Sequence, residues 1–391
     1  MRPLAPLADP LLILLIALLL GGHATASEVD DEVTEKPAMV APEPGPFEVE
    51  IVDRTLRDDD RGKDLPVVVC FPKTGEGPFP VVIFSHGAGG SGRNVTPLPR
   101  FWASHGYVCI APTHAESITL RRGSGREEAP GPVVQALNSS ELWADRAGDI
   151  SFLIDSLDKL AGEVPALQGR VNADRIGVGG HSLGAFTTQL IGGATIKLRG
   201  QDEPKNFADD RPLAFLLLSG QGTGQMGLHE RSWDGFDRPL MGITGTLDRG
   251  AGGQGYEWRG EPFEHAPPGD KYHIVLQGAH HGSFTGRFAE PGDKAPARLG
   301  AAAQSRLEAR PDAVPPARRE ALRERLNERL GEGRGMDQAG GVDPAVLFGH
   351  VQAATLAFWN VYLKDDAQAQ ALLNSEALPD RQKGALIYQR K

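Results

Sequence analysis

The stretch Arg175-Ile-Gly-Val-Gly-Gly-His-Ser-Leu-Gly-Ala-Phe186 contains the pattern that decides the fold. Its first four residues form a β-type run, a Gly-His-Ser-Leu-Gly corner follows at 180–184, and the residues after the corner are compatible with a helix. A strand, a sharp turn and a helix in this order present the serine at the tip of the turn, where a nucleophile is exposed. Gly180 and Gly184 suit the corner, because strand and helix can pass closely only where no Cβ intervenes. Ser182 is therefore the predicted nucleophile.

Strand-type and helix-type runs alternate on both sides of this stretch. The strand-type runs are 47–52, 65–71, 81–85, 107–111, 213–219, 239–244 and 272–276, and the helix-type runs are 97–105, 139–162 and 344–363. Several of the strand-type runs are apolar throughout, which is typical of strands that are buried on both faces. The alternation predicts an α/β fold with a mostly parallel, doubly covered sheet, formed by a single domain over 47–391.

The N-terminus has the features of an export signal. Arg2 precedes an apolar block at 11–20, and Ala24-Thr25-Ala26 forms a small-residue cleavage site. The block is shorter than the about 20 apolar residues that a spanning helix needs. Residues 1–26 are thus predicted to be a cleaved signal peptide, which leaves a periplasmic or secreted protein with no stable membrane span. Residues 27–46 are acidic and rich in proline, and this composition predicts a linker.

Composition excludes some classes of partner. The chain has 391 residues and a formal net charge of −10, which argues against nucleic acid binding. Cys70 and Cys109 both lie in strand-type runs and are expected to be buried free thiols. No metal-ligand spacing occurs, so neither a metal nor a cofactor is expected. Nothing in the sequence indicates an oligomeric state.

A charged segment interrupts the alternation between the last strand-type run and the last helix-type run. Residues 290–343 are dense in Arg, Glu, Ala and Pro, and a helix is predicted where Leu322, Leu326 and Leu330 recur at a spacing of four. One hypothesis is a lid or partner-binding helix over the active site. The thin apolar stripe favours the alternative hypothesis, in which the segment is exposed to solvent and does not cover the active site.

A serine nucleophile needs a base that removes its proton and an acid that orients the base. When the serine occupies a strand-turn-helix corner, the acid and then the histidine follow it on loops after later strands. Asp248 comes directly after the strand-type run 239–244 and is the predicted acid. His280 and His281 both follow the run 272–276, and the pattern does not choose between them.

Catalysis on an acyl group also needs two N–H donors for the developing oxyanion. Leu183 follows the nucleophile and supplies the first. The second is expected in the loop 85–90, where Ala88 is the first choice and Gly87 the second. That Gly-rich loop could instead cradle a phosphate, but the chain has no matching G-x-x-x-x-G-K-[ST] motif. Further candidates for lining the pocket are His86, His114, Trp143 and His280, although a packed or solvated role is expected for the first three.

Several motifs together carry a resemblance to a known family. They are Phe84-Ser-His-Gly-Ala-Gly89, Ser104-His-Gly-Tyr-Val-Cys-Ile-Ala-Pro112, Asp174-Arg-Ile-Gly-Val-Gly-Gly-His-Ser-Leu-Gly184, Gly245-Thr-Leu-Asp248 and Gly278-Ala-His-His-Gly-Ser-Phe284. With them the chain resembles α/β-hydrolases of the group that contains platelet-activating-factor acetylhydrolases and the dienelactone-hydrolase-like and polyester-hydrolase-like serine esterases. The resemblance spans about 47–288 and the last helix. It implies that His281 is the base, and it agrees with Asp248 and Ala88.

The resemblance has two departures. A serine replaces the cysteine nucleophile of true dienelactone hydrolases, and the charged segment 290–343 is not typical of the group. The expected function is that of an exported serine hydrolase, which cleaves a small-molecule, lipid or polymer carboxylic ester through an acyl-enzyme. An acyltransferase or peptidase with the same triad is the first alternative. A catalytically inactive binding protein of the cell envelope is the second.

Overall fold

The computed structural model describes residues 42–123, 137–198, 200–250, 252–286, 342–375 and 386–391. The predicted signal peptide 1–26, residues 27–41 of the predicted linker and residues 290–341 of the charged segment lie outside these residues. Their assignments remain predictions. Within the described ranges, no helix combines the length and the apolar character that a bilayer crossing needs.

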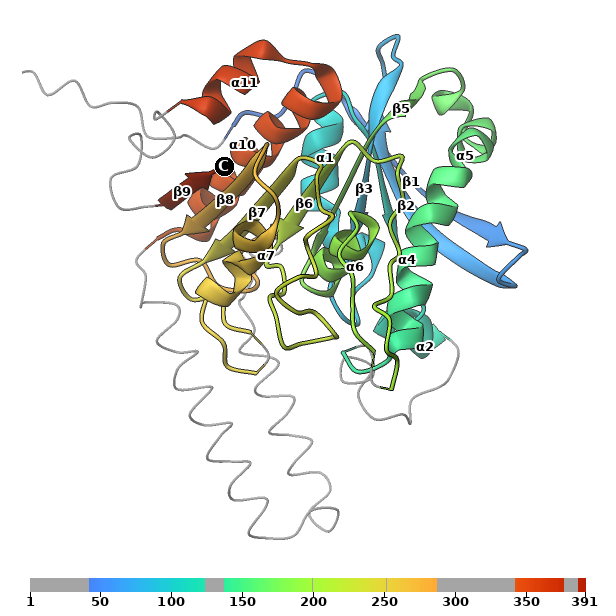
Figure 1. The fold of residues 1–391 in the computed structure, drawn as a ribbon. Coiled ribbons are helices and arrows are strands. Elements are labelled where there is room, and N and C mark those ends of the chain that lie inside the picture. The colour runs from blue at the N-terminus through green and yellow to red at the C-terminus, as the bar shows by residue number, and fades with distance from the viewer. Residues whose placement is uncertain (1–41, 124–136, 199, 251, 287–341, 376–385) are drawn as a thin grey trace, which may run out of the picture. The chain divides into compact units, whose positions relative to one another are not determined.

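The described residues form one nine-stranded sheet in the order β1-β2-β4-β3-β5-β6-β7-β8-β9 (Figure 1). The strands are β1 (Val49–Asp58), β2 (Lys63–Pro72), β3 (Phe79–Ser85), β4 (Val108–Pro112), β5 (Val171–His181), β6 (Ala214–Leu218), β7 (Leu240–Gly245), β8 (Lys271–Leu276) and β9 (Leu386–Arg390). The six central strands, from β4 to β8 in the order of the sheet, are parallel, while β1, β2 and β9 pair antiparallel. This mostly parallel sheet confirms the predicted α/β-hydrolase architecture.

Helices cover both faces of the sheet (Figure 1). Those that pack on one face are α4 (Ser140–Asp155), α5 (Leu157–Glu163) and α6 (Leu183–Ile191), and those on the other are α1 (Pro97–Ser104) and α10 (Pro344–Lys364). Strand β3 shows why the central strands are apolar throughout. Its Val81 and Ile83 belong to the first core, and Val82 and Phe84 to the second. Each residue of such a strand therefore faces a packed layer.

The predicted single helix over 139–162 is wrong in one respect. Ser139 caps the N-terminus of α4 by accepting a hydrogen bond from the N–H of Leu142, but the helix ends at Asp155 and α5 begins at Leu157. The intervening Ser156 has φ −98° and ψ 6°. Because the apolar spacing continues across this turn, the pattern could not reveal the break.

Several short or terminal helices and strands were not predicted from the sequence. They are α2 (Ile118–Gly123), α7 (Glu261–His265), α11 (Ala367–Asn374), β9 and the 3-10 helices η1 (Gly92–Val95), η2 (Pro165–Leu167) and η3 (Glu257–Gly260). Segments of this length carry too few periods of a hydrophobic pattern to be identified from sequence. Strand β9 is mostly polar and exposed, and it forms by pairing with β8 at the edge of the sheet.

The two cysteines face each other across β2 and β4. Cys70 and Cys109 are direct cross-strand partners, and both are buried free thiols. In the same register the N–H of Thr113 donates to the carbonyl of Pro66. Because hydrogen-bonded pairs alternate along an antiparallel ladder, the cysteines also occupy a hydrogen-bonded pair, with Cα atoms about 5.5 Å apart. At such a pair the Cβ atoms lie farther apart than the about 3.8 Å of a typical disulfide.

We therefore expect both thiols to stay reduced and unreactive in the folded protein. Burial raises the pKa of Cys70 to about 12 and raises that of Cys109 well above its ordinary value, so neither forms the reactive thiolate at neutral pH. Titration with Ellman's reagent should detect no thiol in buffer and two in denaturant. If the unreduced protein showed a mass lower by two hydrogens, the pair would be oxidised and the expectation wrong.

Candidate active site

Ser182 occupies a strained turn between β5 and α6. Its φ of 56° and ψ of −121° lie outside the regions that non-glycine residues favour. A Cβ at Gly180 would lie 2.3 Å from the backbone of Gly184, and one at Gly184 would lie 1.9 Å from the carbonyl oxygen of Ser85. Both glycines are therefore sterically required. The corner has the geometry that the sequence predicted.

Three of the predicted residues meet at this corner. The Nε2 atom of His281 is 3.0 Å from Ser182 Oγ, and its Nδ1 atom is 2.9 Å from Asp248 Oδ1. Asp248 follows β7 and His281 follows β8, at the same edge of the sheet as Ser182. His280 instead accepts a hydrogen bond from the N–H of Gly282, within its own loop. The structure thus places His281, and not His280, beside the serine.

The surroundings of Asp248 keep its carboxyl group ionised. Ser219 and Thr244 donate hydroxyl hydrogen bonds to Oδ2, and Arg259 forms an ion pair of 3.0 Å with Oδ1. Burial on its own would raise the pKa of Asp248. The hydrogen bond from His281 and the charge of Arg259 outweigh burial and hold that pKa below its ordinary value. An ionised Asp248 accepts the Nδ1–H of His281 and leaves Nε2 free to accept a proton.

Ser219 and Arg259 were not identified from the sequence. Ser219 has a φ of 61° directly after β6, and its hydroxyl lies 2.7 Å from His281 Nδ1. The buried guanidinium of Arg259 donates to the backbone carbonyls of Ser219, Gly220, Asp248 and Arg249. It thereby ties the loop after β6 to the loop that carries Asp248. The position after an apolar strand could have drawn attention to Ser219, whereas no pattern marks Arg259.

His181, which precedes Ser182, supports the loop that carries His281. Its ring packs against that of His281 at a centroid distance of 4.8 Å, and its Nε2–H donates to the backbone carbonyl of His281 at 2.8 Å. Burial lowers the pKa of His181 to about 3, so the ring is neutral. His181 therefore orients the loop of His281 without adding charge.

The predicted oxyanion donors belong to two segments that adjoin Ser182. Leu183 begins α6, and a Cβ at Gly87 would lie 3.3 Å from the Cβ of Ser182, so the loop that carries Ala88 approaches Ser182 closely. Among the described residues, no protein acceptor is recorded for the N–H of either Ala88 or Leu183. Two unused N–H groups beside a serine are what the stabilisation of an oxyanion requires.

The three other candidates for pocket lining are buried. His86 and His114 are fully inaccessible, and Trp143 packs edge-to-face on Phe186 at a centroid distance of 5.5 Å. All three are therefore packed, as expected, and the alternative that they line an open pocket is wrong. His86 is part of the loop 85–90 and is hydrogen-bonded to His114, which also bonds to Ser85, and Trp143 belongs to the core.

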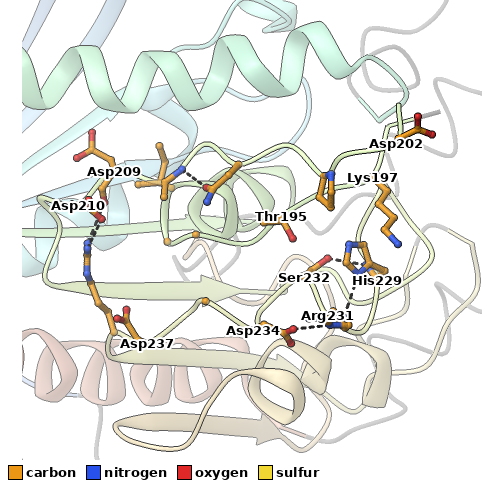
Figure 2. A pocket seen from close by; sticks show the side chains of 18 residues that line it. Thr195, Lys197, Asp202, Asp209, Asp210, His229, Arg231, Ser232, Asp234 and Asp237 are labelled. Atoms are coloured by element: carbon orange, nitrogen blue, oxygen red, sulfur yellow. Dashed lines mark hydrogen bonds and ion pairs between the residues drawn. The ribbon is translucent and has the colours of Figure 1, made fainter. Parts of the chain in front are cut away.

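A pocket of about 600 Å³ lies away from the triad. Its lining includes Ile191, the last residue of α6, whereas Ser182 directly precedes the first residue, about 13 Å away along the helix axis. Figure 2 shows the charged side chains that line it, with Arg231 and Asp234 paired at 2.8 Å. This pocket is therefore not the substrate site of Ser182. Within the part of the chain that the structure describes, no cluster of three or more His, Cys, Asp or Glu side chains could hold a metal ion.

Comparisons with known proteins add little to this geometry. No protein-family model and no curated protein matches the chain. One similar solved structure is described as a putative dienelactone hydrolase from Klebsiella pneumoniae, with 17% identity and a TM-score of 0.44 over 67% of this chain and 98% of that chain. The fold assignment rests instead on the strand order and on the corner at Ser182. On that evidence the chain has the α/β-hydrolase fold.

Proposed function

We propose that the protein is an exported serine hydrolase that cleaves carboxylic esters. The observation that carries the proposal is the continuous hydrogen-bonded series from Ser182 Oγ through His281 to Asp248, at 3.0 Å and 2.9 Å. An activated serine with two nearby N–H donors suits acyl transfer. Export is supported by the signal peptide predicted at 1–26.

Acylation begins when Ser182 Oγ attacks the ester carbonyl and His281 Nε2 takes the hydroxyl proton. The carbonyl oxygen becomes an oxyanion, which the N–H groups of Ala88 and Leu183 stabilise. Asp248 remains ionised and stabilises the imidazolium. As the tetrahedral intermediate collapses, the bond to the alcohol breaks and His281 returns the proton to the leaving alkoxide. The products of this half-reaction are the free alcohol and an acyl-Ser182 ester.

Deacylation repeats these steps with water as the nucleophile. His281 removes a proton from the water, and the resulting hydroxide attacks the acyl carbonyl. The second oxyanion occupies the same N–H pair, and collapse of the intermediate returns the proton to Ser182 Oγ. The acid is released and the enzyme is regenerated. The substrate class proposed is a small-molecule, lipid or polymer ester.

The test uses the mature chain from Ser27 and two reagents. A p-nitrophenyl ester series from acetyl to decanoyl should release p-nitrophenol, and a fluorophosphonate probe should label one residue, which peptide mass spectrometry should identify as Ser182. Labelling without ester turnover would favour another acyl reaction, such as peptide hydrolysis or transfer to an acceptor. Absence of both activities would contradict the proposal and favour the inactive binding protein.

A further inference from the structure

The buried residue Arg146 of α4 contacts the elements on either side of the nucleophile. Only 1% of its surface is exposed. One terminal nitrogen donates to Ser85 Oγ at 2.9 Å and to the carbonyl of His86, while Nε donates to Thr187 Oγ1 at 2.9 Å. Glu116, also buried, pairs with the other terminal nitrogen. One side chain thus connects the loop 85–90, which carries the proposed oxyanion donor Ala88, with helix α6.

On the loop side, the His86 carbonyl that Arg146 contacts directly precedes the peptide unit that carries the N–H of Ala88. The oxygen of that unit is the Gly87 carbonyl, which accepts from His86 Nδ1–H at 2.7 Å and from the Gly90 N–H at 3.0 Å. Because a peptide unit is planar, fixing its oxygen also sets the direction of its N–H. The His86 ring is held in turn, since its Nε2 accepts the backbone N–H of His114 at 3.0 Å.

On the helix side, Thr187 extends the connection to Leu183. The Thr187 hydroxyl accepts from Arg146 and donates to the Leu183 carbonyl at 3.0 Å. Leu183 supplies the other N–H proposed for the oxyanion. The guanidinium of Arg146 therefore donates a hydrogen bond directly to the His86 carbonyl in the loop. It is connected to the Leu183 carbonyl in the helix by two consecutive hydrogen bonds, through the Thr187 hydroxyl.

The charges in this network are balanced. Burial alone would raise the pKa of Glu116, but the Arg146 charge helps to hold it below its ordinary value, so the two form an ion pair. Burial, together with the Arg146 charge, lowers the pKa of His86 to about 4 and keeps the ring neutral, so Nδ1 donates and Nε2 accepts. Buried ion pairs contribute little net stability compared with apolar residues. A role in orientation gives a reason for this one.

The same network contains a second Ser-His-Asp series, which is not a second active site. Ser85 Oγ is 2.9 Å from His114 Nε2, and His114 Nδ1 is 2.8 Å from Asp149 Oδ2. All three side chains are fully buried, so no substrate can reach Ser85. The Ser85 hydroxyl also accepts a hydrogen bond from Arg146. The series therefore forms part of the support for the loop.

We infer that Arg146 is a positioning residue for the oxyanion hole, which holds the two N–H donors in register by linking the loop 85–90 to α6. This inference rests on the proposed function. A positioning role differs from a purely stabilising role because an oxyanion hole acts mainly on the transition state. Loss of the Arg146 contacts should therefore lower kcat and leave KM nearly unchanged.

The first test compares two adjacent threonines of α6. Thr187→Val removes the hydroxyl that links Arg146 to the Leu183 carbonyl. Thr188→Val is the matched control, because Thr188 is also buried and donates to the carbonyl four residues earlier, but no bond to Arg146 is recorded for it. The readouts are kcat and KM on p-nitrophenyl acetate and the second-order rate of Ser182 labelling by a fluorophosphonate. We expect Thr187→Val to lower kcat and the labelling rate about tenfold, and Thr188→Val to leave both near wild type.

The second test removes the ion pair as a unit. Arg146→Gln combined with Glu116→Gln leaves no unpaired charge, and should lower kcat and labelling about 10- to 100-fold. That loss is smaller than the roughly 10²- to 10³-fold loss of kcat that follows removal of one oxyanion-hole hydrogen-bond donor. Arg170→Gln is the control, since Arg170 donates to the backbone carbonyls of Pro72, Thr74 and Ala166, outside this network, and it should leave kcat and labelling near wild type.

Labelling separates the two proposals, because it reports on the serine and its oxyanion hole whatever the natural substrate is. Wild-type labelling rates in folded variants with altered Arg146 or Thr187 would overturn the inference and leave the serine-hydrolase proposal intact. If the wild type itself were not labelled at Ser182, the proposed function would fail and the inference with it. Circular dichroism should first establish that each variant is folded.

Discussion

Ser182→Ala is expected to reduce kcat on a p-nitrophenyl ester by roughly 10⁴- to 10⁶-fold. Alanine removes the only atom that can form the acyl bond, but it keeps the backbone of the corner and both N–H donors. A residual rate above that of water should remain, because the oxyanion hole alone accelerates hydrolysis. The measurement is single-turnover and steady-state release of p-nitrophenol at a fixed pH.

Two variants give this experiment its control and its second arm. Ser232→Ala makes the same chemical change at a buried serine beside the distant charged pocket, and should leave kcat unchanged. Asp248→Asn should lower kcat by about 10⁴-fold, because an amide cannot hold His281 in the tautomer that accepts the serine proton. If Ser182→Ala kept activity within tenfold of wild type, the assigned nucleophile would be wrong.

Acidification from pH 7 to pH 4 is expected to lower the free energy of unfolding by several kcal/mol. Burial lowers the pKa of His86 from 6.5 to about 4 and that of His181 to about 3. Below pH 6.5 the unfolded chain takes up protons at these positions while the folded protein does not, so protons favour unfolding. Each pKa unit is worth about 1.4 kcal/mol, which gives about 3 kcal/mol for each histidine at pH 4. Urea unfolding at pH 7, 5.5 and 4 measures the loss.

A variant isolates one of the two contributions. His181→Gln keeps an N–H donor for the His281 carbonyl but has no site that titrates in this range, so it should lose about 3 kcal/mol less between pH 7 and pH 4. The charges near His181 are those of Asp248 and Arg259, with His281 beside them, and they stay in the variant. A free energy of unfolding that did not change from pH 7 to pH 4 in the wild type would refute the expectation.

The corner at Ser182 could be predicted from sequence because its requirements are local. Gly180 and Gly184 are needed where a Cβ would meet the backbone a few residues away or the adjoining strand, and the turn must follow a buried strand directly. The continuous apolar runs likewise indicated that both faces of the sheet are covered. Asp248 could be named because it follows a strand at the edge where parallel strands end.

Contacts between distant residues were decided by the tertiary structure. The residue pattern left His280 and His281 open, and only the fold brings His281 within reach of a serine 99 positions earlier. No sequence pattern marked Ser219, Arg259 and Arg146, since the contacts of Ser219 with Asp248, of Arg259 with Ser219 and of Arg146 with Ser85 join residues 29 to 61 positions apart. The same holds for His86 and His114, which were candidates for the pocket and are buried instead. Local sequence patterns indicate backbone geometry and burial. The hydrogen-bond partner of a buried polar group depends instead on how the whole fold packs.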